Sequence, residues 1–325
     1  MQRGEDRKLT MPQVSIVTAL HNKGPYVAET IRSVLAQTMP DWELIVVENG
    51  STDNGPEIVR QFLDARIRLV VSSRCGPGTA RNFGADHANG VWVLFLDADD
   101  LIEPEHLAIL LQEAGKNPGV GVVAGGWKEF PNDSPRELVR HRPATFGFSH
   151  DELLARAVAL APWILHAAMV KRSILMEHNR WPEPLDACPD EDTAFWFPVL
   201  LESQVAWADQ SGALYRRFAG GSRSESGGLS SRIAGYSKIV EHNLAAAERR
   251  GIKILPKCYG TISMMFEVSY RTALATGDTA AAEFALANAS FWLKKCPGES
   301  WNIRLRHWFG ISTVNRLKLI LQRGK

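Results

Sequence analysis

The sequence predicts an α/β fold, with a mostly parallel sheet flanked by helices and a smaller C-terminal helical region. Within 12–118, short β-branched segments alternate with segments whose apolar residues recur every three or four positions. This βαβ order predicts parallel strands joined by crossover helices. Beyond residue 229 the composition turns helical, after a Gly/Ser-rich stretch at 220–228. The two patterns therefore predict two regions of different architecture.

Four strands are expected in the first region, because each of four short segments is rich in apolar residues, many of them β-branched: Val14–Leu20, Trp42–Val47, Arg66–Val71 and Val91–Leu96. Four helices are expected between and after them: Tyr26–Gln37, Pro56–Leu63, Thr79–Ala88 and Pro104–Ala114. The segment 120–207 is less regular and carries five tryptophans. Three further helices follow: Ile233–Arg249, Thr261–Thr276 and Thr279–Leu293, the last two forming a hairpin around Gly277.

The composition is that of a globular protein of 325 residues with a net charge of +1, which gives no argument for nucleic acid as a partner. Its four cysteines have no metal-ligand or redox spacing, so reduced thiols and a cytoplasmic location are expected. No apolar stretch reaches membrane-spanning length. The expected boundaries are a disordered leader at 1–11, an α/β domain at 12–225 with halves 12–118 and 119–225, and a helical region at 229–325.

The most informative segment is the decapeptide 91–100, in which six apolar residues run directly into Asp97, Asp99 and Asp100. Ligands of open α/β sheets bind at the carboxyl ends of the strands. Residues two apart in an extended chain project to the same side, so Asp97 and Asp99 are expected to face one cation. Mn²⁺ or Mg²⁺ suits two carboxylates together with phosphate oxygens. The alternative is an acidic cap on the helix that follows.

Several segments, in order, resemble family 2 glycosyltransferases, which have the GT-A fold. The resemblance covers about two-thirds of the chain and rests on Val14–Asp53, Gly78–Gly84, Gly90–Asp100, Ala168–Leu175, Glu191–Trp196 and Leu214–Arg217. It implies an inverting, metal-dependent hexosyltransferase that moves one sugar from a nucleotide diphosphate sugar to an acceptor hydroxyl. The acceptor is expected to be a glycan or a lipid-linked molecule, in the synthesis of surface polysaccharide, lipopolysaccharide or another glycoconjugate.

The resemblance also implies a nucleotide site, formed by Ala19, His21, Asn49, Arg81 and Asp97. His21 stands where the family usually has an aromatic residue under the base. Asn49 stands where an Asp frequently accepts the imide N–H of uracil, and its carbonyl can accept the same bond. The base stays open among uracil, thymine and guanine.

Arg81 is expected near the diphosphate or ribose, Asp97 on the ribose side, and Asp99 on the metal directly. Each of these residues also has a structural interpretation. His21 can be a surface histidine, Asn49 a turn residue, and Arg81 a partner of Asp86.

The catalytic base implied by the resemblance is Asp192, with Glu191 orienting the acceptor or its loop. The alternative is an acidic helix N-terminus favoured by the helix dipole. Phe218 stands where many relatives carry a His that joins the metal or the diphosphate. The metal therefore has one fewer protein ligand and is bound more weakly, or Arg216 or Arg217 supports the diphosphate by charge.

Among the tryptophans of the acceptor half, Trp127 and Trp163 are candidates for stacking on an acceptor sugar, with core packing as the alternative.

Other functional classes fit less well. A dehydrogenase needs G-x-G-x-x-G after a strand, and a nucleotidyltransferase needs a Gly-rich loop after the first strand; neither is present. A processive synthase needs several membrane spans. A degenerate transferase acting as a non-catalytic sugar- or partner-binding module stays open. The basic, amphipathic segment 300–325 predicts either peripheral contact with the inner face of the cell membrane or a terminal helix docked on the enzyme.

Overall fold

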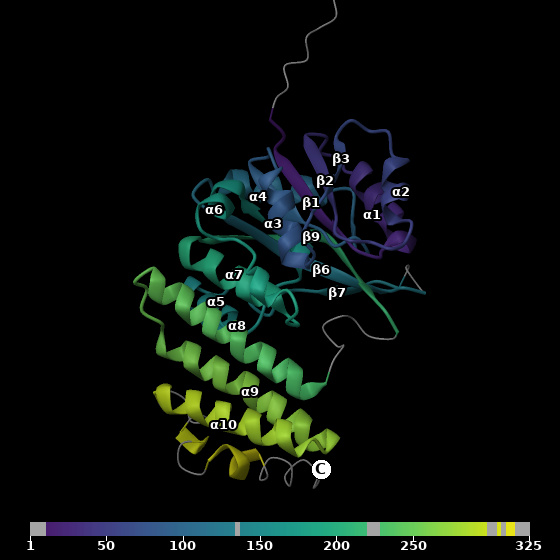
Figure 1. Ribbon diagram of the computed structural model, residues 1–325. Helices are drawn as coiled ribbons and strands as arrows, with labels where there is room; N and C mark the ends of the chain where they lie inside the picture. Colours follow the sequence, from purple (N-terminus) through teal and green to yellow (C-terminus); the bar gives the residue numbers. More distant parts are fainter. Residues whose placement is uncertain (1–10, 134–136, 220–227, 298–303, 307–309, 316–325) are drawn as a thin grey trace, which may run out of the picture. The chain divides into compact units, whose positions relative to one another are not determined.

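The computed structural model describes residues 11–133, 137–219, 228–297, 304–306 and 310–315 (Figure 1). The chain forms two compact units. The first, here the sheet unit, comprises Met1–Pro143, Trp163–Glu183 and Glu202–Gly220. The second, here the helical unit, comprises Ala144–Pro162, Pro184–Leu201 and Gly221–Lys325. The helical unit thus includes Ala144–Pro162 and Pro184–Leu201, and it begins its last segment at Gly221, all within the range 119–225 that the sequence pattern places in the α/β domain. The predicted leader falls almost entirely outside the described residues.

Among the described residues, the sheet unit contains nine strands in the order β3-β2-β1-β4-β8-β6-β9-β5, with β7 paired to β6. Their bounds are β1 Val14–Leu20, β2 Trp42–Glu48, β3 Ile67–Val71, β4 Trp92–Phe95, β5 Leu101–Ile102, β6 Val122–Pro131, β7 Val139–His141, β8 Ala168–Lys171 and β9 Val205–Arg217. The four strands expected from the sequence are therefore all present.

These first four strands, β3-β2-β1-β4, are mutually parallel, as the βαβ pattern predicts. The rest of the sheet is mixed: β8 is antiparallel to β4 and β6, β9 is parallel to β6, and β5 is antiparallel to β9. The irregular segment 120–207 supplies most of these strands. The α/β class is confirmed, and the parallel part keeps the carboxyl ends of β1, β2 and β4 on one edge.

Helices cover both faces of this sheet. The bounds are α1 Gly24–Leu35, α2 Gly55–Arg60, α3 Pro77–Asp86, α4 His106–Lys116 and α6 Arg172–Glu177. Buried side chains of α1, α2 and α4 share one hydrophobic core with β1, β2 and β4. On the opposite face α3 lies so close that a Cβ at Gly84 would stand 2.4 Å from Val17 Cγ1. Only glycine permits this approach of helix to sheet.

A buried histidine pair lies in the sheet unit. His106 on α4 accepts a hydrogen bond at Nδ1 from the Gly212 amide at 3.0 Å, and its Nε2 donates to the His166 carbonyl at 3.0 Å. Burial lowers the pKa of His106 to about 3 and that of His166 to about 4. Both rings are therefore neutral in the folded protein at neutral pH.

The pair predicts an acid-sensitive fold. Because the pKa of His106 lies far below its ordinary value of 6.5, the unfolded chain binds a proton that the folded chain does not. The stabilisation is complete above pH 6.5 and is lost as pH falls toward 3. When the pH is lowered from 7 to 5, the free energy of unfolding measured in urea should fall in both proteins. We expect it to fall by about 2 kcal/mol less in His106→Gln than in the wild type. Equal losses in both proteins would contradict this assignment.

The helical unit contains α5 His150–Ala157, α7 Glu191–Glu202, α8 Leu229–Arg249, α9 Pro256–Thr276 and α10 Thr279–Lys295. The predicted hairpin is confirmed: α9 packs on α10, and Gly277 between them adopts φ 76°. A left-handed residue at a helix C-terminus favours glycine. In the part of the chain that the structure describes, no helix combines the length and apolar character that spanning a membrane requires.

Most of the C-terminal segment 300–325 lies outside the described residues. Within the described part, Arg306 makes buried ion pairs with Glu267 of α9, with nitrogen–oxygen distances of 2.6 and 2.9 Å. Ile311 and Val314 are buried. These residues therefore favour docking on the helical unit for their part of the segment, and membrane contact by the remainder stays a prediction.

Candidate functional site

Three aspartates follow β4 in a tight turn, here called the acidic turn (Asp97–Asp100). The strand ends at Phe95, and the turn is closed by a hydrogen bond from the Asp100 amide to the Asp97 carbonyl at 3.1 Å. The argument from strand alternation does not apply to Asp97 and Asp99, because neither residue lies in an extended strand. That both face one cation stays a prediction. Their directions are set by the turn and by its neighbours.

The acidic turn is held from two sides. Thr30 of α1 donates its hydroxyl to the carbonyls of Ala98 and Asp100 at 3.0 and 2.9 Å. Arg216 of β9 donates from Nε to the Asp99 carbonyl at 2.6 Å and from its backbone amide to Asp100 Oδ1 at 2.7 Å. Helix α1 and strand β9 therefore fix the backbone from which Asp97 and Asp99 project.

Asp100 has a structural role in the interior of the sheet unit. Its carboxyl is buried, and Oδ2 lies 3.4 Å from His166 Nδ1. Burial, and then the neighbouring carboxylates of Asp99 and Asp97, raise the pKa of Asp100 well above its ordinary value. Asp100 therefore anchors the turn from inside.

The two remaining carboxylates each contact a basic side chain. Arg81 of α3 donates from Nη2 to Asp97 at 2.9 Å, and its guanidinium lies 4.3 Å from the Trp181 ring centre. Lys23 Nζ lies 2.5 Å from Asp99 Oδ2. The alternative partner of Arg81, Asp86, instead pairs with Arg180. Arg81 therefore pairs with Asp97 rather than with Asp86, and its contact with the nucleotide stays a prediction.

Neither Lys23 nor Thr30 stands out in the sequence. Their contacts with the acidic turn follow from the pairing of β1 and β4 as parallel neighbours, with Val14 beside Trp92 and Val17 beside Phe95. The residues after β1 then lie next to those after β4. A lysine three residues after the end of the first strand is the one signal by which the sequence could have indicated this contact.

The residues predicted to meet the base also come together. His21 donates from Nδ1 to the Asn49 backbone carbonyl at 2.9 Å, and its ring is exposed. Asn49 donates from Nδ2 to the Gly76 carbonyl at 3.0 Å. Its Oδ1 is buried and accepts no hydrogen bond from the described residues. Ala19 is half-buried near the end of β1. This arrangement leaves an oriented acceptor beside an exposed aromatic ring.

Arg216 and Arg217 differ sharply. The Arg216 guanidinium is buried and donates to Glu29 of α1 at 2.6 Å in addition to the Asp99 carbonyl. Arg217 is half-exposed, with Nε 3.8 Å from Glu129. Phe218 packs edge-on against Tyr26, with ring centres 5.3 Å apart. Arg216 thus positions the acidic turn, and Arg217 is the more available cation of the pair.

Glu191 and Asp192 belong to the helical unit, where they begin α7. The residue before them, Asp190, adopts φ 60°, an uncommon conformation for a residue other than glycine. Asp192 Oδ1 accepts the Thr193 amide at 2.9 Å, and Glu191 is buried. Strained backbone of this kind concentrates at functional sites. The geometry is that of an acidic helix N-terminus with one partly exposed carboxylate, that of Asp192.

The two tryptophan candidates lie in the sheet unit. Trp163 is only 3 % exposed and packs edge-on against Trp207 at 5.6 Å. Such burial favours its packing role, because no ring face is open to a sugar. Trp127 is half-buried and stacks on His141 at 5.7 Å. Of the two, Trp127 is the candidate that keeps some exposed surface.

The acidic turn offers two carboxylates as potential ligands of a divalent ion. Among the described residues, no three His, Cys, Asp or Glu side chains converge on one point. Asp97 and Asp99 supply two carboxylates on one turn, with Asp100 engaged elsewhere. Mg²⁺ bound with nucleotides takes one or two carboxylates and completes its shell with phosphate and water. The residues therefore fit an ion that is shared with a diphosphate.

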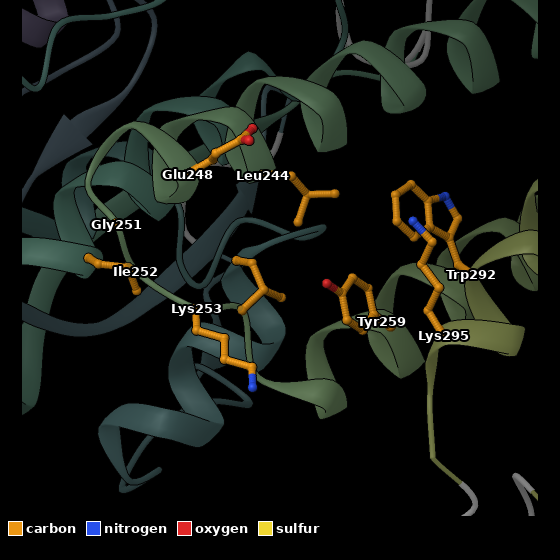
Figure 2. A pocket seen from close by; sticks show the side chains of 9 residues that line it. Leu244, Glu248, Gly251, Ile252, Lys253, Tyr259, Trp292 and Lys295 are labelled. Carbon is orange, nitrogen blue, oxygen red and sulfur yellow. The ribbon is translucent and has the colours of Figure 1, made fainter.

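A separate pocket of about 390 Å³ lies in the helical unit, between α8, the α8–α9 connection, α9 and α10 (Figure 2). Tyr259 and Trp292 line it with nearly parallel rings 6.0 Å apart. Lys295 lies 4.9 Å from the Trp292 ring centre. None of the site residues predicted from the sequence lines this pocket.

The comparisons with known proteins decide the family. Residues 15–178, about half of the chain, match the model of the family described as glycosyl transferase family 2. The chain belongs to this family. The match contains Asn49, Arg81 and the acidic turn, and it ends before Asp192. The family assignment therefore rests mainly on the sheet unit, together with Ala144–Pro162 of the helical unit.

Curated relatives agree with this assignment. The uncharacterized glycosyltransferase EpsJ of Bacillus subtilis (strain 168) is 36% identical over 63% of this chain and 61% of its own length. The succinoglycan biosynthesis protein ExoO of Rhizobium meliloti (strain 1021) is 37% identical over 32% of this chain and 30% of its own. The chain thus covers less than two thirds of the length of these relatives.

Solved structures show the same fold. The S. aureus TarS fragment 1–349, determined with UDP, aligns with a TM-score of 0.65 at 16% identity over 96% of this chain and 92% of that one. The mannosyltransferase PcManGT of Pyrobaculum calidifontis, determined with GDP-Man and Mn²⁺, aligns with a TM-score of 0.53 at 19% identity over 93% and 84%. The expected GT-A fold is confirmed.

Proposed function

We propose that this protein is an inverting glycosyltransferase that transfers one sugar from a nucleotide diphosphate sugar to an acceptor hydroxyl. The observation that carries the proposal is the acidic turn, which projects Asp97 and Asp99 beside Arg81 and Lys23 at the carboxyl ends of parallel strands. Carboxylates and cations intermixed in this way suit a diphosphate bound together with a divalent ion. Family membership supports the same reaction class.

The nucleotide would lie along the edge formed by β1, β2 and β4. His21 would stack on the base, and Asn49 Oδ1 would accept its imide N–H, since that oxygen is buried and has no other donor in the described residues. Arg81 and Asp97 would contact the ribose and diphosphate. The base stays open among uracil, thymine and guanine, because each presents a ring N–H.

Asp99, with Asp97, would hold Mn²⁺ or Mg²⁺. When bound, the ion neutralises the charge that gathers on the departing diphosphate. Asp192 would take the proton of the acceptor hydroxyl as the oxygen attacks the anomeric carbon, and Glu191 would orient the acceptor or its loop. The nucleoside diphosphate leaves from the opposite face of the sugar, so the anomeric configuration inverts. Arg217 is the remaining candidate for diphosphate support, and Trp127 for acceptor stacking.

A glycan or lipid-linked acceptor in polysaccharide synthesis is part of this proposal, supported by the named role of ExoO in succinoglycan biosynthesis. A cytoplasmic location, with peripheral membrane contact through 300–325, is the matching expectation. The non-catalytic alternative is not favoured, because both the paired acids of the acidic turn and Asp192 are present.

The role of Asn49 can be isolated with two variants. Both Asn49→Leu and Asn49→Asp lose the donation to the Gly76 carbonyl, but only Asn49→Asp keeps a side-chain oxygen, here a charged one, that can accept a hydrogen bond from the base. We expect Asn49→Leu to weaken binding of the preferred nucleoside diphosphate about tenfold relative to Asn49→Asp in isothermal titration. Equal affinity of the two variants would exclude Asn49 from base recognition.

The proposed function is tested by a thermal-shift panel of UDP-, GDP- and dTDP-sugars with Mn²⁺. One base class should stabilise the protein by about 2.7 kcal/mol at a hundredfold excess over its dissociation constant. Adenosine diphosphate sugars serve as the matched control. A panel in which no nucleotide sugar shifts the melting temperature would contradict the proposal.

A further inference from the structure

The Asp99 carboxylate forms an ion pair with the ammonium group of Lys23. Lys23 Nζ lies 2.5 Å from Asp99 Oδ2, and the side chains are 37% and 15% exposed. The Lys23 backbone is fixed at the start of α1, where its carbonyl accepts the amides of Tyr26 and Val27 at 2.9 Å each. This ion pair is therefore half-shielded from solvent and built on a rigid helix end.

Aromatic rings complete the surroundings of the ammonium. Its nitrogen lies 5.3 Å from the Phe218 ring centre and 6.0 Å from that of Tyr26. Ring faces attract a cation but donate no lone pair to a metal. Phe218 stands where the family resemblance leads one to expect a histidine ligand. The rings therefore favour an ammonium over a divalent ion on this side of Asp99.

A free divalent ion must compete with this ammonium for the carboxylate. A bound diphosphate relieves the competition between the ammonium and the divalent ion for the Asp99 carboxylate. It carries more than one negative charge and offers phosphate oxygens to both cations. The flexible side chain of Lys23 can follow the phosphates while Asp99 becomes available. Binding of the ion and binding of the donor are then coupled through one side chain.

We propose that Lys23 makes divalent-ion binding at Asp99 conditional on the donor. Without donor, the Lys23 ammonium occupies the carboxylate; with donor, it moves to the diphosphate and releases Asp99 to the ion. This assignment rests on the proposed nucleotide-sugar function and adds a residue and an order of binding to it.

The test uses the full chain and two titrations: Mn²⁺ alone, and UDP, GDP and dTDP each in EDTA. Removing the ammonium in Lys23→Met should raise the affinity for Mn²⁺ about tenfold and lower that for the diphosphate about tenfold. Lys23→Arg keeps the charge and should resemble the wild type in both titrations. Lys116→Met is the matched control, since Lys116 pairs with Glu113 on the surface of α4.

Opposite changes in the two titrations support the proposal, because a purely structural role would lower both affinities together with the melting temperature. Unchanged constants, or a joint loss of both, would overturn it. If the wild type binds none of the three diphosphates with or without Mn²⁺, the proposed function itself fails. If it binds them and Lys23→Met changes neither constant, the role of Lys23 alone fails.

Discussion

Replacement of Asp192 by Asn is expected to lower kcat about 10³-fold, while the dissociation constant of the nucleoside diphosphate stays unchanged. An acceptor hydroxyl is a weak nucleophile at neutral pH, and a positioned carboxylate removes its proton during attack. Asn keeps the shape of the side chain and the acceptor for the Thr193 amide, but it takes up no proton. The measurement is sugar transfer under saturating donor, together with titration of the nucleotide.

The matched control is Asp151→Asn. Asp151 occupies the first turn of α5, as Asp192 occupies that of α7, so both variants lose a similar favourable charge at a helix N-terminus. The control should keep the turnover of the wild type. An Asp192→Asn protein that retains a tenth or more of that turnover would exclude Asp192 as the base.

Replacement of Asp99 by Asn is expected to lower kcat/KM by about 10²- to 10³-fold, the range seen when one group that stabilises transition-state charge is removed. The variant lacks the carboxylate proposed to hold the divalent ion, and Lys23 loses its charged partner. Mn²⁺ should then no longer strengthen nucleotide binding. Steady-state kinetics and titration with and without Mn²⁺ measure the two effects.

Asp86→Asn provides the control for this variant. Asp86 forms an exposed ion pair with Arg180 on the sheet unit, outside the acidic turn. It should change neither kinetics nor Mn²⁺ dependence. If Asp99→Asn were as active as Asp86→Asn, the acidic turn would have no part in the reaction.

The first half of the fold could be predicted because local pattern and tertiary role agree there. In β2 every residue is buried, as the apolar run Leu44–Val47 at its centre indicates. The second half could not, because its strands do not keep one pattern. Strand β6 is buried at first and then half-exposed, and its pairing with β9 shifts register between Gly125 and Trp127. No window of sequence reveals such a change.

In the candidate site, too, some features could be predicted from the sequence pattern and others depend on tertiary contacts. The acids after β4 are visible as a break in an apolar run, so Asp97 and Asp99 could be identified. The contacts that Lys23, Arg81 and Arg216 make with the acidic turn could not be predicted, because these residues reach it from segments far apart in the chain. Arg81 and Arg216 are named only through the family resemblance. The direction of each carboxylate depends on a turn rather than on strand alternation. Burial of Trp163 likewise depends on packing against Trp207, which composition alone does not indicate.

The most direct test of the central claim is a crystal structure of the protein with the preferred nucleoside diphosphate and Mn²⁺. We expect the ion on Asp99, shared with the diphosphate, and Lys23 Nζ moved from the carboxylate to a phosphate oxygen. A diphosphate bound elsewhere, with Lys23 still paired to Asp99, would contradict the account.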